Sequence, residues 1–162
     1  MSSKTIYLLR HTKAEDRSIL RSDVDRSLVE KGRQQALQIG AFIRRQQLQP
    51  DQLLTSPYPR AMQTAMLVAA SADLRCEVQE VLWLSHGTTT EVQLAALQQS
   101  ITDWPEHSLL VGHEPELSAL LTALLNTDAT KIRIKKGTLV CMRYDPAAGF
   151  SLQWLLPCRL MR

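Results

Sequence analysis

Ile6-Tyr7-Leu8-Leu9-Arg10-His11 contains the first apolar run of the sequence. Four consecutive apolar residues predict a short strand that is buried on both faces, as the strands of a parallel sheet are. The run stops abruptly at Arg10-His11, so two side chains capable of chemistry stand where the strand would end. Residues 6–9 are therefore expected to form a central strand with polar residues at its carboxyl end.

Two further segments repeat this arrangement of an apolar run followed by polar residues. Gln52-Leu53-Leu54-Thr55 precedes Ser56-Pro57-Tyr58-Pro59-Arg60, whose two prolines lack the N–H group that a strand interior needs. Ser108-Leu109-Leu110-Val111 precedes Gly112-His113-Glu114-Pro115, and Pro115 suits the first position of a helix. Strands that alternate with helices predict an α/β three-layer sandwich, with a mostly parallel central sheet flanked by helices.

Capping residues and hydrophobic periodicity place the expected helices. Ser27-Leu28-Val29-Glu30 is typical of a capping box that opens a helix ending before Pro50, and Thr88-Thr89-Thr90-Glu91 is typical of another. The predicted apolar faces of the four helices consist of Ala36, Ile39 and Ile43; Met62, Ala65, Met66 and Ala69; Leu94, Leu97 and Ile101; and Leu117, Leu120, Leu121 and Leu124.

Three more strands complete the predicted sheet. One spans Glu77 to Leu82, after the second helix. The other two, Thr138 to Tyr144 and Phe150 to Leu156, are joined by Asp145-Pro146-Ala147-Ala148-Gly149, a sequence typical of a hairpin turn.

The composition is that of one globular domain spanning residues 1–162. Hydrophobic residues make up 44% and charged residues 22%, which argues against intrinsic disorder, collagen and coiled coil. The formal net charge is +3, and the Lys and Arg residues are spread along the sequence, so we expect no nucleic-acid partner. The short basic run from Lys131 to Lys136 is interpreted as a solvated strand or loop.

Cysteine usage and apolar run lengths predict a cytoplasmic protein without membrane contact. The three cysteines, Cys76, Cys141 and Cys158, are odd in number and have no CxxC spacing, as expected of free thiols in a reducing compartment. A zinc site would need a tighter cluster of ligands. Residues 6–9 are too few for a signal-peptide core, and Leu117 to Leu125 is about half the length that spans a bilayer.

The residues that follow the predicted strands suit a phosphoryl group. In parallel sheets the carboxyl ends of the strands meet at one edge, where ligands bind, so Arg10, His11, Arg60 and His113 would converge there. Guanidinium groups match phosphate oxygens, helix N-termini add free N–H donors, and neutral imidazole is a nucleophile at physiological pH. The GxxxxGK[ST] loop of nucleotide-binding enzymes is absent, and no carboxylate follows the first strand directly.

Three ordered motifs resemble those of the histidine phosphatase superfamily, the relatives of cofactor-dependent phosphoglycerate mutase. Leu8-Leu9-Arg10-His11-Thr12 is similar to the signature Leu-x-Arg-His-Gly, and Ser56 to Ala65 is similar to Ser-Pro-x-x-Arg-Ala-x-x-Thr-Ala. Val111-Gly112-His113-Glu114-Pro115 resembles the second histidine motif, and Asp25 to Ala36 resembles a stretch common in small members. The likeness is greatest to the small phosphohistidine phosphatase branch typified by SixA, and it implies a phosphoglycerate mutase-like fold.

The resemblance implies a role for each matching residue. His11 would be the nucleophile that is transiently phosphorylated, and Ser56 would assist less directly. Arg10, Arg60 and His113 would complete the phosphate pocket. Thr12 replaces the usual glycine, which loses easy access to a positive φ but places a hydroxyl where it could donate to a phosphate oxygen. No metal or cofactor is implied, because cationic side chains would neutralise the phosphate charge.

One departure from the family pattern points to the substrate. Mutases and many phosphomonoesterases of the superfamily carry an acid after the third strand, but Val81 to Gly87 contains no carboxylate. A positioned acid accelerates the departure of an alkoxide by about 10²–10⁴-fold, whereas imidazole leaves more easily. The missing acid therefore favours phosphohistidine. His86 is interpreted as a surface or substrate-edge residue, with proton donation as the alternative, and His107 would lie at the opposite end of the sheet.

The expected function is that of a phosphohistidine phosphatase acting on a partner protein, such as a phosphorelay or phosphotransferase-system protein. The chain lacks the long insertions that form lids in larger relatives, and an open pocket suits a protein side chain. Two alternatives stay open. One is a small-molecule phosphomonoesterase with Glu80 or Glu15 as the acid, and the other is a phosphoprotein-binding module without turnover, to which only Thr12 points. The protein is expected to be a monomer.

Overall fold

A mixed sheet forms the centre of the computed structural model, which describes residues 1–128 and 131–162. Within these residues the sheet has six strands in the order β3-β2-β4-β1-β5-β6. The strands are β1 (Lys4–Arg10), β2 (Gln52–Thr55), β3 (Val78–Glu80), β4 (His107–Gly112), β5 (Leu139–Asp145) and β6 (Gly149–Leu156). The pairs β3/β2, β2/β4 and β4/β1 are parallel, and β1/β5 and β5/β6 are antiparallel.

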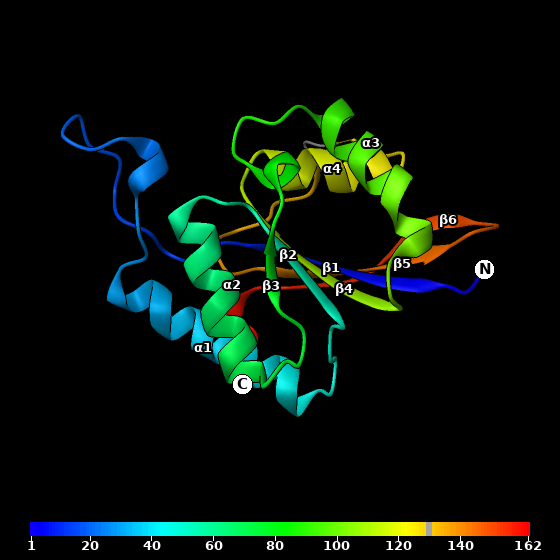
Figure 1. Ribbon diagram of the computed structural model, residues 1–162, viewed down its shortest axis with the longest axis horizontal. Coiled ribbons are helices and arrows are strands. Elements are labelled where there is room, and N and C mark those ends of the chain that lie inside the picture. Colours follow the sequence, from blue (N-terminus) through cyan, green and yellow to red (C-terminus); the bar gives the residue numbers. More distant parts are fainter. Residues whose placement is uncertain (129–130) are drawn as a thin grey trace.

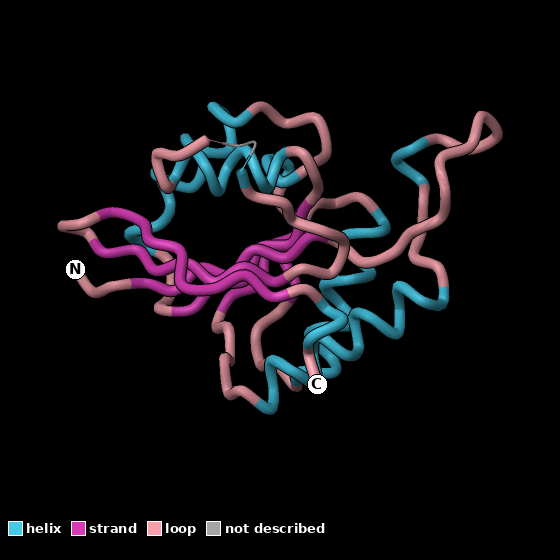
Figure 2. Tube along the Cα trace, turned by 180° about the vertical axis from the view of Figure 1, so that it is seen from behind, coloured by secondary structure: helices cyan, strands magenta, loops and turns pink. Residues whose placement is uncertain are grey.

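Helices cover both faces of this sheet. Helices α1 (Glu30–Arg45) and α2 (Pro59–Ala72) pack against one face, and α3 (Thr90–Ser100) and α4 (Glu116–Leu124) lie over the other (Figure 1). The view from behind shows the same three layers, with the strands between the two helix pairs (Figure 2). The α/β three-layer sandwich expected from the sequence is confirmed.

The apolar run of β1 serves both halves of the core. Successive side chains of a strand point to opposite faces, and Tyr7 and Leu9 join the core beneath α1 and α2. Ile6 and Leu8 join the core beneath α3 and α4. Because all four side chains are buried, the strand needs a continuous apolar run rather than an alternating one.

Strand register decides which residues meet at the carboxyl edge of the sheet. In the parallel pair β1/β4, Arg10 is opposite Gly112, and the His11 N–H donates to the Gly112 carbonyl at 3.1 Å. In the pair β2/β4, Thr55 is opposite Val111. The residues that directly follow these three strands therefore start at the same level, and His107 lies at the other end of β4, opposite Thr5, as predicted.

Two predicted capping boxes are wrong in detail. Helix α1 has Val29 rather than Ser27 as its N-cap, because residues 27–29 run extended against residues 13–15: the Ser27 N–H donates to Glu15 Oε1 and the Val29 N–H to the Lys13 carbonyl. Helix α3 is capped by Thr89, whose hydroxyl oxygen accepts from the Val92 N–H, whereas the Thr88 hydroxyl donates to the Ser85 carbonyl.

The inward face of α2 also differs from the prediction. Of the four residues expected to form it, Ala65 is buried, Met62 and Ala69 are half-buried and Met66 is 58% exposed. The buried face is made up of Arg60, Ala61, Thr64, Ala65, Val68 and Ala72. The polar residues Arg60 and Thr64 lie on the buried face of α2. A prediction based on apolar residues alone therefore placed the buried face too far around the helix.

Other predictions agree more closely with the structure. Strand β2 has the predicted bounds, β1, β4, β5 and β6 differ by two residues or fewer at each end, and β3 is shorter because Leu82–Leu84 forms a 3-10 turn. The basic run is a loop except for a single helical-turn residue at Lys131. The three cysteines are free. Of the helices in the described part of the chain, none has the length and apolar character needed to cross a bilayer.

Candidate active site

His11 stands at the end of β1 with one ring nitrogen already engaged. Its Nδ1 lies 2.8 Å from the backbone carbonyl oxygen of Thr12. A carbonyl can only accept, so Nδ1 carries the proton and Nε2 keeps its lone pair. The side chain is only 4% exposed. This contact fixes the tautomer of the ring and leaves the Nε2 lone pair free.

His113 lies beside His11, with 5.2 Å between the ring centroids. Its Nε2 is 2.7 Å from the hydroxyl oxygen of Ser56, which also accepts the Tyr58 N–H at 3.2 Å. The Ser56 hydroxyl can donate to the His113 Nε2 lone pair, which places the His113 proton on Nδ1. Ser56 thus positions the His113 ring. The Tyr58 ring packs against the other side of His113, at 5.2 Å between centroids.

Arg60 is held at the start of α2 by a residue from a distant loop. The side chain is 1% exposed, its Nη1 donates to the Asp23 carbonyl at 2.8 Å, and its Nη2 is 3.3 Å from Asp23 Oδ2. Asp23 also accepts from Arg26 Nε at 2.9 Å. Burial raises the pKa of Asp23, but Arg60, Arg26 and Arg17 lower it by more, so its carboxyl stays charged beside these guanidinium groups.

Arg10 is fixed from the opposite side by the segment that precedes β5. Its Nη1 donates to the Ile134 carbonyl at 3.0 Å. The Gly137 N–H donates to the carbonyls of Arg10 at 3.1 Å and His11 at 3.3 Å. These hydrogen bonds hold residues 134–137 against the end of β1. The basic run noted in the sequence therefore lies next to Arg10 and His11.

Several donors at this site have no partner. Among the buried side-chain atoms of the described residues without a hydrogen bond are Arg10 Nε, Arg60 Nε and His113 Nδ1. A buried donor without a partner costs about 1–3 kcal/mol, so three around one histidine indicate a site for a missing acceptor. We refer to Arg10, His11, Arg60 and His113 as the cationic cup. The structure brings all four predicted residues together.

Electrostatics keep both histidines of the cup neutral. Burial lowers the pKa of His11 to about 3, and Arg60, Arg10 and Lys136 lower it further against the opposing effect of the Thr12 carbonyl. Burial, followed by the nearby His11 and Arg60, lowers the pKa of His113 to about 2. A neutral imidazole has a free lone pair on one ring nitrogen, and the positive field of the nearby arginines suits an anionic ligand.

Thr12 contributes its backbone, whereas its hydroxyl is engaged elsewhere. The residue is fully buried, its N–H donates to Thr64 Oγ1 at 3.2 Å, and its own hydroxyl lies 3.3 Å from the same oxygen. Thr64 in turn donates to the Arg60 carbonyl at 2.7 Å. Thr12 is not among the residues with positive φ, so a side chain is compatible with this position. The hydroxyl thus links the segment that follows β1 to α2, and its contact with phosphate stays a prediction.

His86, interpreted from the sequence as a surface or substrate-edge residue, lies beside the cup. Its ring centroid is 5.6 Å from that of His113. Its Nδ1 lies 2.9 Å from Glu116 Oε1, at ion-pair distance without the alignment of a hydrogen bond. The same Glu116 oxygen accepts the Gly87 N–H, which anchors the loop that carries His86 to the start of α4. His86 therefore stands at the edge of the site.

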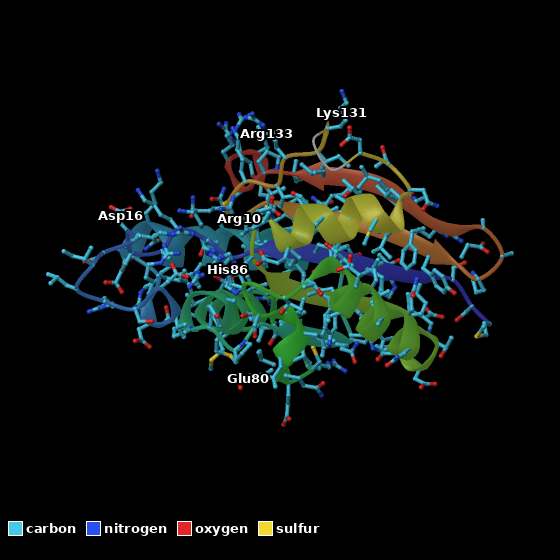
Figure 3. All side chains as sticks on the ribbon, turned by 90° about the horizontal axis from the view of Figure 1, so that it is seen from above. Arg10, Asp16, Glu80, His86, Lys131 and Arg133 are labelled. Carbon is cyan, nitrogen blue, oxygen red and sulfur yellow. The ribbon has the colours of Figure 1, made fainter. Side chains whose placement is uncertain are left out.

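The two carboxylates proposed for the alternative reaction lie outside the cup. Glu80 is exposed at the end of β3 and points away from the molecule, whereas Arg10 and His86 lie near its middle (Figure 3). Glu15 forms a bidentate contact with Arg21 at 2.6 and 2.7 Å. Within the described residues, no group of three His, Cys, Asp or Glu side chains is arranged to hold a metal ion.

Sequence reasoning missed Asp23, Glu116 and Lys136. Asp23 begins a three-residue 3-10 turn, which shows no hydrophobic periodicity, so only the fold reveals that it holds Arg60. Glu116 begins a helix, where an acidic residue is common for dipole reasons alone. Lys136 belonged to a run interpreted as solvated. The basic residues that follow the predicted strands were the only feature of the sequence that indicated the site. They identified the four residues of the cup but not the residues that surround and hold them.

Comparison with known proteins places these observations in a family context. The family model of the histidine phosphatase superfamily (branch 1) matches residues 6–107. An uncharacterised protein of Picosynechococcus is 30% identical over 164 aligned positions, which cover 94% of this chain and 99% of the relative.

Solved structures share the fold over nearly the whole chain. The protein histidine phosphatase SixA complexed with tungstate has a TM-score of 0.84 at 19% identity, covering 98% of this chain and 99% of that one. A candidate phosphohistidine phosphatase SixA from Agrobacterium tumefaciens has a TM-score of 0.80 at 25% identity, with coverage of 94% and 97%. A mycobacterial glucosyl-3-phosphoglycerate phosphatase has a TM-score of 0.75 at 17% identity, with coverage of 95% and 99%.

Proposed function

Because this chain belongs to the histidine phosphatase superfamily, we propose that it is a phosphohistidine phosphatase that acts on a partner protein through a phospho-His11 intermediate. The observation that carries the proposal is the His11 ring, whose Nδ1 is bonded to the Thr12 carbonyl while unpartnered donors of Arg10, Arg60 and His113 stand around it. A phosphorelay or phosphotransferase-system protein would present the substrate side chain.

The first chemical step transfers the phosphoryl group to His11. The Nε2 lone pair attacks phosphorus in line, the bond between phosphorus and the substrate imidazole breaks, and that imidazole leaves with the electron pair and takes a proton from solvent. The Thr12 carbonyl stabilises the charge that develops on the His11 ring through Nδ1–H. Water then attacks phosphorus, the bond between Nε2 and phosphorus breaks with its electron pair returning to Nε2, and inorganic phosphate leaves as H₂PO₄⁻ with both protons of that water. His11 thereby returns to its neutral form.

The cationic cup stabilises the transferring group. Arg10 Nε, Arg60 Nε and His113 Nδ1 are fixed donors for its equatorial oxygens, and fixed donors need no reorganisation during the reaction. Arg60 is held by Asp23 and Arg10 by Ile134, so both guanidinium groups are oriented before the substrate arrives. We infer that side-chain cations take the part that a metal ion plays in other phosphatases, and that the reaction proceeds without one.

The leaving group favours phosphohistidine as the substrate. Neither Glu80 nor Glu15 lies at the cup, and the loop from Val81 to Gly87 contains no carboxylate. An alkoxide would leave slowly without a general acid, whereas an imidazole needs little assistance.

The test compares substrates of these two types. A histidine-phosphotransfer domain phosphorylated with phosphoramidate and a panel of sugar and glycerate phosphates are incubated with the enzyme, with and without EDTA. We expect kcat/KM for the phosphohistidine protein to exceed that for every monoester by about 10²-fold or more, which is the lower range of general-acid assistance. EDTA should leave the rate unchanged. A monoester that matches the protein substrate would refute the assignment.

A small-molecule phosphomonoesterase is a second candidate, and His86 is the observation that favours it. Its ring stands 5.6 Å from that of His113 with Glu116 beside it, so it could donate a proton to a leaving alkoxide. Under this alternative, His86→Gln would slow the hydrolysis of a phosphate with a poor leaving group and spare one with a good leaving group. Under the phosphohistidine assignment, the same variant should hydrolyse phosphohistidine at about the wild-type rate.

A further inference from the structure

We propose that a cationic surface beside the cup, made up of Lys31, Lys135, Lys136 and Arg159, docks an acidic region of the phosphohistidine protein. The inference rests on the proposed function and adds the character of the partner surface. Lys135 and Lys136 are adjacent in the segment before β5, whereas Lys31 lies in α1 and Arg159 near residue 162. The sequence alone gives no sign that these three segments meet.

A hollow of about 500 Å³ brings the four cations together. Between them it is lined by three glutamines of α1, and no Asp or Glu belongs to the lining. All four cationic residues are exposed. Among the residues that the structure describes, no carboxylate lies within ion-pair distance of any of the four. The hollow therefore carries positive charge that the protein itself does not neutralise by pairing.

The cationic surface is continuous with the cup. Lys135 also lines a second hollow, of about 460 Å³, together with Arg10 and Arg133. Glu114 is the only carboxylate in that second lining, and both its oxygens already accept hydrogen bonds from Ser118. The Gly137 N–H donates to the carbonyls of Arg10 and His11, so the segment that bears these lysines is fixed to the nucleophile strand.

The field around Lys136 also indicates an excess of positive charge. Burial lowers the pKa of its ammonium group, as do Arg10, Arg26 and Lys13, and only Asp16 acts in the opposite direction. Figure 3 shows Arg133 and Lys131 together at one margin of the molecule, with Arg10 between them and its middle. The whole chain has a net charge of only +3, so this concentration of cations is a local feature.

Charge complementarity selects an acidic protein surface as the occupant. A phosphate monoester would be taken up by the cup alone, whereas the cations extend from Arg10 across two hollows. Facing patches of opposite charge raise association rates by about 10–10³-fold and orient the partner. A phosphohistidine flanked by Asp and Glu would place its phosphoryl group in the cup while its flanks lie on the cationic surface.

The test uses two phosphohistidine peptides of equal length that carry either four Glu or four Gln residues around the phosphohistidine. The variant is Lys31→Glu with Arg159→Glu, neither of which belongs to the cup. The control is Arg44→Glu with Arg75→Glu, two exposed arginines elsewhere, which changes the net charge by the same amount. We expect wild type to have a kcat/KM about 10-fold higher for the Glu peptide at low salt. The Lys31 and Arg159 variant should lose that preference, and the control should keep it.

Each other outcome has a defined meaning. If wild type has equal kcat/KM for the two peptides, or if the control variant loses the preference for the Glu peptide as much as the Lys31 and Arg159 variant does, the docking surface is refuted. The proposed phosphohistidine hydrolysis is unaffected by either result. Hydrolysis of monoesters but of neither peptide overturns the proposed function, and the docking inference with it. A single-stranded oligonucleotide that competes as well as an unphosphorylated Glu peptide would show a general polyanion site and overturn the assignment to a protein.

Discussion

His11 shows how single contacts prepare the site before a substrate binds. The Thr12 carbonyl fixes the proton on Nδ1, and burial keeps the ring neutral with a pKa of about 3. Thr12, which replaces the usual glycine, therefore orients the proposed nucleophile through its backbone carbonyl, a group that any residue type could supply. Its side chain joins Thr64, so the departure from the motif adds a link between β1 and α2.

Arg60 is the residue whose substitution should most reduce turnover without removing the nucleophile. Arg60→Ala is expected to lower kcat/KM by about 10³-fold or more, the lower range measured for a guanidinium group that stabilises a transferring phosphoryl group. Arg60→Lys keeps the charge but loses the planar donors, and we expect a loss of about 10²-fold. Steady-state kinetics with a phosphohistidine protein measures both, with circular dichroism as the control for folding. Activity within threefold of wild type in Arg60→Ala would contradict the role.

The depressed pKa values of the two histidines also predict how stability depends on pH. Below pH about 6.5 the unfolded chain protonates both imidazoles, whereas the folded protein keeps His11 neutral to about pH 3 and His113 to about pH 2. The unfolded state then binds more protons, so the free energy of unfolding falls as the pH falls from about 6.5 to about 3.

His113→Gln should make this loss of stability less steep. Glutamine can still reach Ser56 but does not titrate, so unfolding should take up about one proton fewer near pH 5. Urea denaturation at a series of pH values measures the slope. An unchanged slope in the variant would show that His113 is protonated in the folded state.

Among the elements, the site depends on how closely α1 approaches the segment that follows β1 and begins with His11. A Cβ atom built on Gly32 would lie 1.9 Å from the Lys13 carbonyl oxygen, so only glycine fits there. Residues 13–15 and 27–29 are thereby held together, and the Leu28 N–H donates to Gln63 of α2 at 2.8 Å. This packing gives a physical reason for the glycine in the helix segment of the motif.

Gly32→Ala is therefore expected to destabilise the protein although it lies in a helix. Alanine ordinarily stabilises a helix interior by up to about 1 kcal/mol relative to glycine. Here the clash with backbone should reverse the sign and lower the free energy of unfolding by about 2 kcal/mol or more. Thermal denaturation measures the change, and Arg33→Ala, at the next and exposed position of α1, serves as the control. A more stable Gly32→Ala protein would contradict the packing.

The sequence predicted elements where one pattern dominated and failed where two patterns competed. The apolar runs of β1, β2 and β4 have no alternative interpretation, and the parallel order followed from them. Helix α2 carries inward polar residues of the site, so its apolar residues indicated the wrong face. Ser27 matched a capping box but is engaged by Glu15, a tertiary contact that local sequence cannot reveal. Asp23 was missed for the same reason.

At the scale of the whole molecule, the sheet gathers at one edge charges that are scattered in the sequence. Arg10 ends β1, Arg60 lies in α2 and His113 follows β4. Lys31 and Arg159 line a hollow with Lys135, which also lines a hollow with Arg10. The spread of basic residues along the chain therefore says little about their spread in space. Because of the resulting positive field, the folded protein should bind tetrahedral oxyanions more tightly than the unfolded chain does.

Tungstate should consequently stabilise the fold. Ligand at about 100 times its dissociation constant adds about 2.7 kcal/mol, which for a chain of this size raises the thermal midpoint by about 5–10 °C. The measurement is a thermal scan at pH 7 with tungstate or with chloride at equal ionic strength. Arg60→Ala should abolish the increase. An equal increase in that variant would place the anion outside the cup.

The most direct test of the central claim is the location of the phosphoryl group during a single turnover. Enzyme in excess over a ³²P-labelled phosphohistidine protein is quenched in alkali within milliseconds and analysed by peptide mapping. We expect an alkali-stable, acid-labile label on His11, formed before inorganic phosphate appears, and no label or turnover in His11→Ala. Phosphate release at the full rate without a labelled His11, or undiminished turnover in His11→Ala, would contradict it.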